Sequence, residues 1–408
     1  MLVDDIRNMF PLLSRKIYGK DLVYFDNAAT SQRPQSVIDE WNRITCESNA
    51  NIHRAVHKLA DEATQAYEQA RDAVKDFINA EFREEIIFTS GTTASVNLAA
   101  FCFGEAYIKE GDEVIVTEAE HHSNIVPWQM MCRRKGAILK VLPIDDSGHL
   151  IIDELDSLIT GRTRIMAVTH ISNVLGIVNP VKDIVEKCHS KGVAVLVDGA
   201  QGAVHCKVDV RDMDCDFYVF SGHKLYAATG TGVLYGKKKW LENMPPYMGG
   251  GEMVGTVKFS GTTYAPLPMK YEAGTQNFAS AATLKPAIEL LNILNDNNLE
   301  EYNNSIKDYL LNILINDERI RLYGVPRGTS EEKIPLFSFT VKGIHHEDLA
   351  LILDKMGIAV RSGQMCAEPL MDRFGVTGML RISLAPYNTM QEAEYFVKCL
   401  NKAIMMLV

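Results

Sequence analysis

The sequence of 408 residues lacks any pair of cysteines at CxxC spacing and any cysteine and histidine combination at the spacing of a zinc site. Its eight cysteines are scattered, so we expect no bound metal and a reducing, cytoplasmic setting. No uninterrupted apolar stretch reaches the length that spans a membrane, and acidic residues at positions 4 and 5 are not typical of a signal peptide. We therefore expect no membrane association.

The chain also lacks an excess of basic residues, since its formal net charge is −10. This charge argues against nucleic acid or an anionic membrane as the main partner. The sequence has no internal repeats. Its composition is 47% hydrophobic and 23% charged, which is enough to bury a full core, and its length allows two domains.

Strand-like apolar runs alternate with helical segments from about residue 21 to residue 286. This alternation predicts an α/β fold with a mostly parallel, buried sheet and helices on both of its faces. The expected strands are 85–89, 113–117, 139–143, 164–169, 193–197, 217–220 and 233–235, and the expected helices include 61–79, 123–135 and 180–191.

The two ends of the chain have a different pattern. Residues 1–20 favour a short amphipathic helix that Pro11 bends or splits. The Gly- and Pro-rich segment 243–277 favours an ordered excursion rather than a linker. Later come expected helices at 280–297, 346–356 and 391–407 and strands at 336–341 and 358–361. We predict a large α/β domain of residues 21–286 and a small α+β domain of residues 1–20 and 287–408.

The strongest chemical signal is a lysine directly after a predicted strand. One apolar run ends in Ser221-Gly222-His223-Lys224, and another ends in Asp198, 26 residues before the lysine. Either residue alone is more often a solvated loop residue or a turn cap, but two strand ends in this order favour a cofactor site. A lysine can hold a carbonyl cofactor, and a carboxylate can keep a pyridine nitrogen protonated. The pair predicts pyridoxal 5'-phosphate (PLP).

A second signal is a group of donors suited to an anion. The segment 88–93 ends a predicted strand and opens a helix expected near Ala94. Backbone amides at that helix start, with the hydroxyls of Thr92 and Thr93, can bind a phosphate. Gly-Thr-Thr alone would be typical of a plain helix cap, but Ser221 and His223 add donors and favour phosphate binding.

Two residues near the end of the chain suggest substrate chemistry. Arg381 lies on an apolar run that predicts a strand. Burying a guanidinium there has a large desolvation cost unless an anion pairs with it. That anion could be a substrate carboxylate or, as a purely structural alternative, a nearby acidic side chain. Cys366 lies in a polar, glycine-containing stretch typical of an exposed loop, unlike the other cysteines in their apolar surroundings.

These motifs, and others in the same order, resemble the aminotransferase class V family of fold-type I PLP enzymes. Within that family the chain resembles the SufS-type (group II) cysteine desulfurases over nearly its whole length. The matching segments are 24–30, 51–57, 88–93, 120–124, 169–176, 198–201, 221–224, 272–275 and 361–366.

The resemblance implies a PLP-dependent conversion of L-cysteine to L-alanine. In such an enzyme the thiolate of Cys366 takes up the substrate sulfur as a persulfide, and Lys224 moves the α-proton. The persulfide is then passed to an acceptor protein for iron–sulfur cluster assembly. A homodimer is implied as well, because Thr275 would reach the phosphate of the second subunit.

The resemblance also implies roles for the other site residues. His121 would stack over the cofactor ring and shuttle protons. Asp198 would lie at the ring nitrogen, and Asn173 and Gln201 near the phenolic oxygen. The phosphate would be held by Thr92, Thr93, Ser221 and His223, and the substrate would be bound by Arg381, Asn173, His53 and Arg361.

Three departures from the family pattern bear on activity and partners. Gln364 and Met365 precede the cysteine where the group commonly has two histidines, and Ala94 replaces a common acidic residue. Glu347 stands where members served by a SufU-like, zinc-containing partner usually have histidine. This last difference favours a SufE-like sulfur acceptor.

Three alternatives remain open at this point. The reaction of a selenocysteine lyase would depend less on the thiol of Cys366, because selenium is a better leaving atom than sulfur. Other class V enzymes would keep the PLP residues but have no use for a thiol in the loop. A non-catalytic assembly scaffold would have no need to keep Lys224, Asp198 and His121 together with that thiol.

Overall fold

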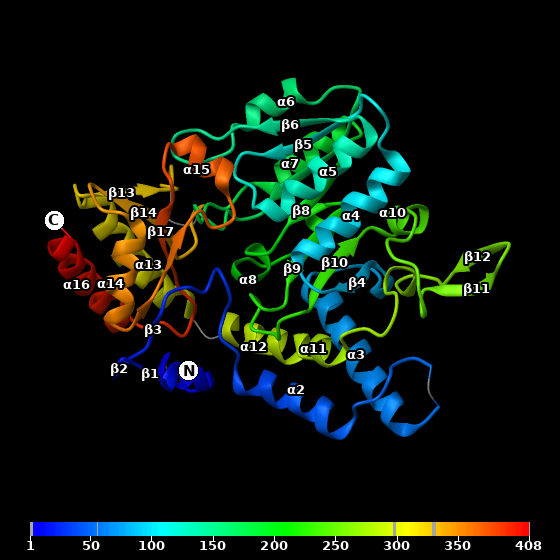
Figure 1. Cartoon of the computed structure of the whole chain (residues 1–408), viewed down its shortest axis with the longest axis horizontal. Coiled ribbons are helices and arrows are strands. Elements are labelled where there is room, and N and C mark those ends of the chain that lie inside the picture. The colour runs from blue at the N-terminus through cyan, green and yellow to red at the C-terminus, as the bar shows by residue number, and fades with distance from the viewer. Residues whose placement is uncertain (1–2, 55, 297–298, 329–331, 408) are drawn as a thin grey trace.

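Seven strands form the central sheet of the computed structural model, which describes residues 3–54, 56–296, 299–328 and 332–407 (Figure 1). Strand β10 runs antiparallel to both of its neighbours, and the other neighbouring pairs are parallel. All seven strands expected from the sequence are confirmed. In spatial order they are β4 (Ile86–Thr89), β10 (Gly232–Gly236), β9 (Phe217–Ser221), β8 (Ala194–Asp198), β7 (Thr163–Thr169), β5 (Glu113–Thr117) and β6 (Ile138–Leu142).

Alternate side chains of the central strands enter two separate hydrophobic clusters. In β8, for example, Val195 packs in one cluster and Leu196 in the other. Because both faces of the inner strands are buried, these strands are mainly apolar, which explains why they were visible in the sequence. The helices that complete the clusters are α3 (Lys58–Phe77) and α7 (Val181–Ser190) on one face, and α4 (Thr92–Tyr107) and α5 (Val126–Lys135) on the other.

The remaining helices of the first 296 residues are shorter or lie at the edge of this sandwich (Figure 1). The helix expected at 280–297 is interrupted after Ala282. Apart from the short helix at residues 3–7, these helices are α2 (Gln35–Glu47), α6 (Leu155–Leu158), α8 (Gly202–His205), α9 (Val210–Met213), α10 (Lys238–Asn243), α11 (Phe278–Ala282) and α12 (Leu284–Asp296).

A second, antiparallel sheet with its own hydrophobic cluster lies beside the central one (Figure 1). Val23 and Phe25 also pack in this cluster, and β3 (Val23–Tyr24) pairs with β15 (Ile358–Ala359). This separate core supports the second domain, and the two-domain division given above stays a proposal. Within residues 1–20, however, Ile6, Phe10 and Leu13 pack in the cluster of the central sheet. The second sheet has the order β13 (Ile320–Tyr323), β14 (Leu336–Val341), β17 (Met379–Ser383) and β16 (Arg361–Gly363), with helices α13 (Leu299–Asn316), α14 (His346–Lys355), α15 (Glu368–Phe374) and α16 (Met390–Leu407).

The first twenty residues differ in part from the expectation. Helix α1 (Val3–Arg7) and a 3-10 turn (Pro11–Ser14) confirm the split at the proline, but the helix expected beyond it is wrong. There the chain forms the hairpin β1 (Lys16–Ile17) and β2 (Lys20–Asp21). Tyr18 and Gly19 connect these strands with φ of 51° and 76°, a left-handed conformation that ends any helix.

The Gly- and Pro-rich excursion is ordered, as expected. It contains the hairpin β11 (Val254–Lys258) and β12 (Gly261–Tyr264), which projects from the rest of the molecule (Figure 1). Residues 297–298 of the asparagine-rich stretch lie outside the described residues, as do residues 1–2. Among the helices that the structure describes, none is both long and apolar enough to cross a membrane.

Candidate active site

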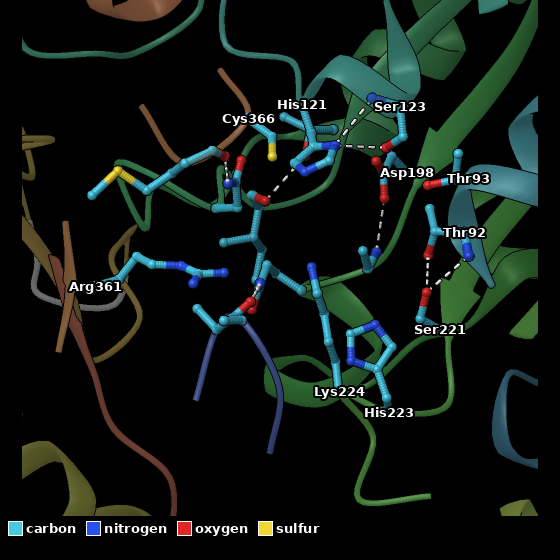
Figure 2. A pocket seen from close by; sticks show the side chains of 18 of the residues that line it. Thr92, Thr93, His121, Ser123, Asp198, Ser221, His223, Lys224, Arg361 and Cys366 are labelled. Atoms are coloured by element: carbon cyan, nitrogen blue, oxygen red, sulfur yellow. Dashed lines mark hydrogen bonds between the residues drawn. The ribbon is translucent and has the colours of Figure 1, made fainter. Parts of the chain in front are cut away.

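A cavity of about 350 Å³ opens at the carboxyl ends of the central strands, where α/β sheets place their ligand sites (Figure 2). Asp198 ends β8 and Ser221 ends β9, so the predicted strand ends meet here. Strands β16 and β17 of the second sheet close the other side with Arg361 and Arg381. All the predicted site residues line this cavity except His53 and Thr275.

The anion end of the cavity lies at the start of α4. The hydroxyl of Ser221 accepts from the Thr92 backbone N–H at 2.8 Å and lies 2.7 Å from the Thr92 hydroxyl. Burial, with Lys224 and Arg33 nearby, lowers the pKa of His223 to about 4, so this imidazole is neutral at neutral pH. A helix N-terminus surrounded by hydroxyls and an imidazole is suited to a phosphate.

Lys224 and Asp198 converge from two neighbouring strands (Figure 2). Burial lowers the pKa of Lys224 to about 8; Asp198 opposes this shift, and Arg381 adds to it. Burial also raises the pKa of Asp198, which accepts a hydrogen bond from the Ala200 N–H at 2.9 Å. The site therefore holds an amine that loses its proton easily and a carboxylate that would gain from a cationic partner.

His121 follows β5 and faces the same cavity (Figure 2). Its Nδ1 accepts from the Ser123 backbone N–H at 3.0 Å and lies 2.7 Å from the Ser123 hydroxyl. Because a backbone amide can only donate, the neutral imidazole carries its proton on Nε2. Burial is the main cause that lowers the pKa of His121 to about 4, with Lys224 and His122 adding to it.

Arg381 is 2% exposed and already has protein partners. Its Nη2 donates to Asp26 Oδ1 at 3.1 Å and its Nη1 to the Asn173 carbonyl at 2.8 Å, while Nε has no partner among the described residues. Arg361 Nε lies 4.0 Å from the other oxygen of Asp26. The structural ion pair considered for Arg381 thus exists, and an unused donor remains on the same guanidinium. Asp26 was not singled out from the sequence.

Cys366 is exposed, as expected, and lines the cavity from a tight turn between β16 and α15. The turn is closed by the Ala367 N–H, which donates to the Gln364 carbonyl at 3.0 Å. Met365 is buried, and its carbonyl accepts from Asn173 Nδ2 at 2.9 Å. Helix α15 was missed in the sequence, although Glu368 and Pro369 in its first turn are a common start signal.

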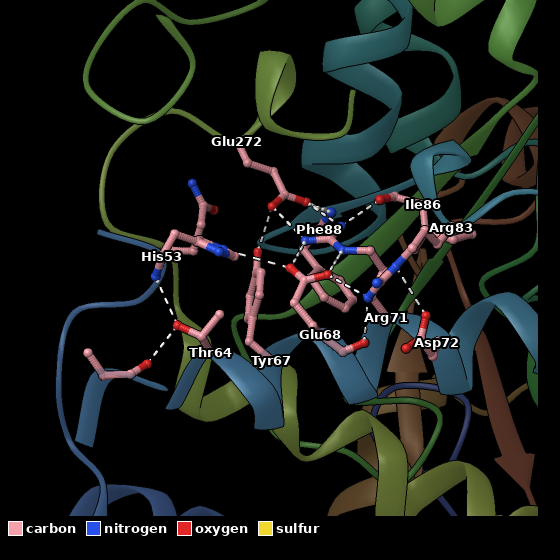
Figure 3. Close-up of polar contacts among 12 residues, drawn as sticks. His53, Thr64, Tyr67, Glu68, Arg71, Asp72, Arg83, Ile86, Phe88 and Glu272 are labelled. Atoms are coloured by element: carbon pink, nitrogen blue, oxygen red, sulfur yellow. Dashed lines mark hydrogen bonds and ion pairs between the residues drawn. The ribbon is translucent and has the colours of Figure 1, made fainter. Parts of the chain in front are cut away.

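His53 lies away from the cavity, beside a buried ion-pair network (Figure 3). Its Nε2 is 3.7 Å from Glu68, and its ring packs edge-on against Tyr67. At the centre of the network, Arg71 donates to both carboxylate oxygens of Glu272, at 2.8 and 2.9 Å. The substrate-binding role expected for His53 stays a proposal.

Glu272 anchors the segment 272–275, which contains Thr275. Besides Arg71, the Tyr67 hydroxyl donates to it at 2.8 Å and the Phe88 backbone N–H at 2.7 Å. Phe88 belongs to β4, the strand that leads into the anion end of the cavity. Thr275 itself does not line the cavity of its own chain.

Known proteins identify the family of this chain. Residues 23–396 match the family described as Aminotransferase class-V. The chain belongs to this family. A cysteine desulfurase of Cronobacter sakazakii is 45% identical over 97% of this chain and 96% of the relative. A cysteine desulfurase of Escherichia coli O127:H6 is 43% identical over 98% of both chains.

Solved structures agree with this assignment. The cysteine desulfurase CsdA of Escherichia coli, in an S-sulfonic acid form, is 39% identical with a TM-score of 0.92 over 100% of both chains. The apo cysteine desulfurase of Thermococcus onnurineus NA1 is 34% identical with a TM-score of 0.91, covering 99% of this chain and 98% of the other. Within class V the chain groups with the cysteine desulfurases, which confirms the predicted family and the fold-type I architecture.

The class V family implies PLP, and the residues of the cavity fit that cofactor. The anion end at Thr92 and Ser221 matches its phosphate, and the buried Asp198 matches its ring nitrogen. Lys224 supplies the amine for its carbonyl group. Among the described residues no cluster of histidine, cysteine and acidic side chains could hold a metal ion.

The depressed pKa of Lys224 leads to a testable pH dependence. Only the neutral amine attacks a carbonyl, and a pKa of about 8 places its deprotonation below the usual value of 10.5. Uptake of PLP by cofactor-free protein should therefore accelerate about fivefold from pH 7 to pH 8 and level off above that. Stopped-flow absorbance of the lysine-bound cofactor measures the rate, with Nα-acetyl-lysine as the control. If the rate keeps rising up to the pH at which the reaction of Nα-acetyl-lysine levels off, the pKa of Lys224 is not depressed.

Proposed function

We propose that this chain is a PLP-dependent L-cysteine desulfurase that forms L-alanine and a persulfide on Cys366. The observation that carries the proposal is the exposed Cys366 thiol on the cavity that Lys224 and Asp198 line from the opposite sheet. A thiol has no function in most other class V chemistry, but a sulfur acceptor must face both the substrate and the solvent.

The cofactor would be held by residues from five central strands and the loops that follow them. When bound, PLP supplies an electron sink next to the α-carbon of the substrate. The neutral amine of Lys224 removes the α-proton, for which its pKa of about 8 is well matched. The residues proposed to bind the cofactor are Thr92, Thr93, His121, Asn173, Asp198, Gln201, Ser221, His223 and Lys224, with Thr275 from a second subunit.

Sulfur transfer would take place at Cys366. Its thiolate attacks the substrate sulfur, so that an S–S bond forms as the carbon–sulfur bond of L-cysteine breaks. The electron pair of the broken bond stays with the carbon fragment, which is protonated to L-alanine. His121 presents an Nε2–H to the cavity and can supply or relay that proton.

Arg381, which lines the cavity and has not used all of its donors, is proposed to bind the substrate carboxylate. Replacing it with lysine leaves one ammonium nitrogen, whose donors cannot span the separate positions at which the guanidinium contacts Asp26, Asn173 and the substrate. We expect KM for L-cysteine to rise about ten- to hundredfold with a smaller change in kcat. Steady-state alanine production measures both constants.

The matched control is Arg319→Lys, at a surface arginine that also pairs with an aspartate, Asp317. It should leave both constants unchanged. A variant of Arg381 with parental KM and a reduced kcat would show that this guanidinium serves the chemical step instead of substrate binding.

Several finer features of the function belong to the same proposal. We propose transfer of the persulfide to a SufE-like acceptor for iron–sulfur cluster assembly, supported by the short turn that carries Cys366 and by Glu347 at the start of α14. A homodimer is proposed because Thr275 lies outside the cavity of its own chain. The eight free cysteines support a reducing, cytoplasmic setting.

The test is the production of alanine and persulfide from L-cysteine by purified protein, with and without a SufE-type acceptor. Mass spectrometry of the Cys366 peptide should show a gain of one sulfur, and the acceptor should remove it. Bound PLP without persulfide would overturn the desulfurase proposal. Parallel assays with selenocysteine would then distinguish a lyase from the other class V enzymes.

A further inference from the structure

The turn that carries Cys366 has an unfavourable backbone conformation. Met365 and Cys366 have φ of 49° and 56°, so both central residues of the turn are left-handed. Turns of this kind favour glycine, asparagine and aspartate, and neither residue here belongs to that group. Such a conformation persists only where the surroundings hold it in place.

Hydrogen bonds from outside the turn hold both of its central residues. The carbonyl of Met365 accepts from Asn173 Nδ2 at 2.9 Å, as described above. His122 makes two further bonds: its backbone N–H donates to the Cys366 carbonyl at 2.7 Å, and its Nε2 accepts from the Glu368 backbone N–H at 3.0 Å. His122 therefore contacts the chain at Cys366 and again at Glu368.

His122 is itself part of a rigid segment. The preceding Glu120 is fully buried, and its carboxylate accepts from the Thr117 hydroxyl at 2.6 Å and from the Thr169 backbone N–H at 2.8 Å. It also accepts from Asn124 Nδ2 at 2.7 Å. These bonds tie the segment 120–124 to the ends of β5 and β7.

We propose that His122 is a positioning residue that holds the Cys366 turn in register with the cofactor side of the cavity. His121, its neighbour in sequence, lines the cavity, so one rigid segment sets both the cofactor side and the sulfur acceptor. Because Nε2 accepts from a backbone amide, the contact requires a neutral imidazole with its proton on Nδ1. The inference rests on the proposed role of Cys366 as sulfur acceptor.

The test compares three substitutions of His122. Glutamine places its Oε1 the same number of bonds from the backbone as Nε2, so His122→Gln keeps the acceptor. His122→Asn is too short to reach Glu368, and His122→Leu has no acceptor. The backbone N–H contact to Cys366 is common to all three. His149→Leu is the matched control, because it removes an imidazole contact to a backbone group, the Val325 carbonyl, outside the cavity.

Two measurements separate positioning from simple structural support. Single-turnover persulfide formation on Cys366 should slow about tenfold in His122→Leu and His122→Asn, and His122→Gln should recover most of the rate. Hydrogen exchange of the Glu368 amide should accelerate by a similar factor in the first two variants and stay near parental in the third. The visible absorption of bound PLP should be the same in all of them.

Either of two results would overturn the inference. If His122→Leu forms persulfide and exchanges the Glu368 amide at the parental rates, the contact from His122 Nε2 to that amide does not position the turn. Equal losses in His122→Gln and His122→Leu, with loss of bound PLP, would show general structural support. If the parental protein forms no persulfide at all, the proposed function fails, but amide exchange at Glu368 still tests the contact.

Discussion

Replacement of Cys366 by alanine will stop persulfide formation and sulfide release from L-cysteine, a loss of roughly a thousandfold or more. The side chain is exposed and contributes nothing to the core, so the fold and the bound PLP should be unaffected. Sulfide release with a reductant present, measured beside the absorption spectrum of the cofactor, tests both statements.

Cys46 provides the matched control for this substitution, because it is the other exposed cysteine among the described residues. Cys46→Ala should retain the parental rate. Parental sulfide release by Cys366→Ala would remove the residue from the reaction. Cleavage of selenocysteine by Cys366→Ala, without cleavage of cysteine, would show that the lyase chemistry is intrinsic and that the thiol is needed for sulfur alone.

Replacement of Lys224 by alanine should abolish turnover, by about a hundred- to ten-thousandfold, and remove the visible absorption of the lysine-bound cofactor. Although it abolishes activity, the same substitution should stabilise the folded, cofactor-free protein. Burial depresses the pKa of this amine to about 8, so at pH 7 the folded, cofactor-free protein carries an unfavourable buried charge. Removing that charge should raise the Tm of the cofactor-free protein.

The combination of lost activity and a raised Tm separates this outcome from unfolding. The control is Lys207→Ala, at an exposed lysine close in sequence, which should change neither property. The stability gain should shrink as the pH rises from 8 towards 10.5, because the parental amine then becomes neutral in the folded state. Normal turnover by Lys224→Ala would overturn the assignment of the cofactor site.

Most of the cavity could be predicted because its residues follow buried strands. An apolar run that ends in a polar residue is visible in a single sequence, and in a parallel sheet such ends meet at one edge. Asp198, Ser221 and Lys224 are of this kind. The inner strands of the central sheet were visible for a related reason, since burial on both faces keeps them mainly apolar.

The residues that were missed act through contacts distant in sequence. Asp26 meets Arg381 across 355 residues, and His122 meets Glu368 across 246 residues. No local pattern marks such contacts, since an aspartate after a strand and a histidine before a helix have ordinary local explanations. The hairpin after Ile17 was missed for a different reason, because left-handed conformations at Tyr18 and Gly19 overrode a weak helical pattern.

The buried pair of Arg71 and Glu272 bears on how two subunits would associate. Both side chains are completely inaccessible to solvent, and the carboxylate has four donors, so the backbone that leads to Thr275 is set before any partner arrives. A second copy would meet a preformed surface and lose little conformational entropy on binding. Association of this kind would resemble the docking of two rigid bodies.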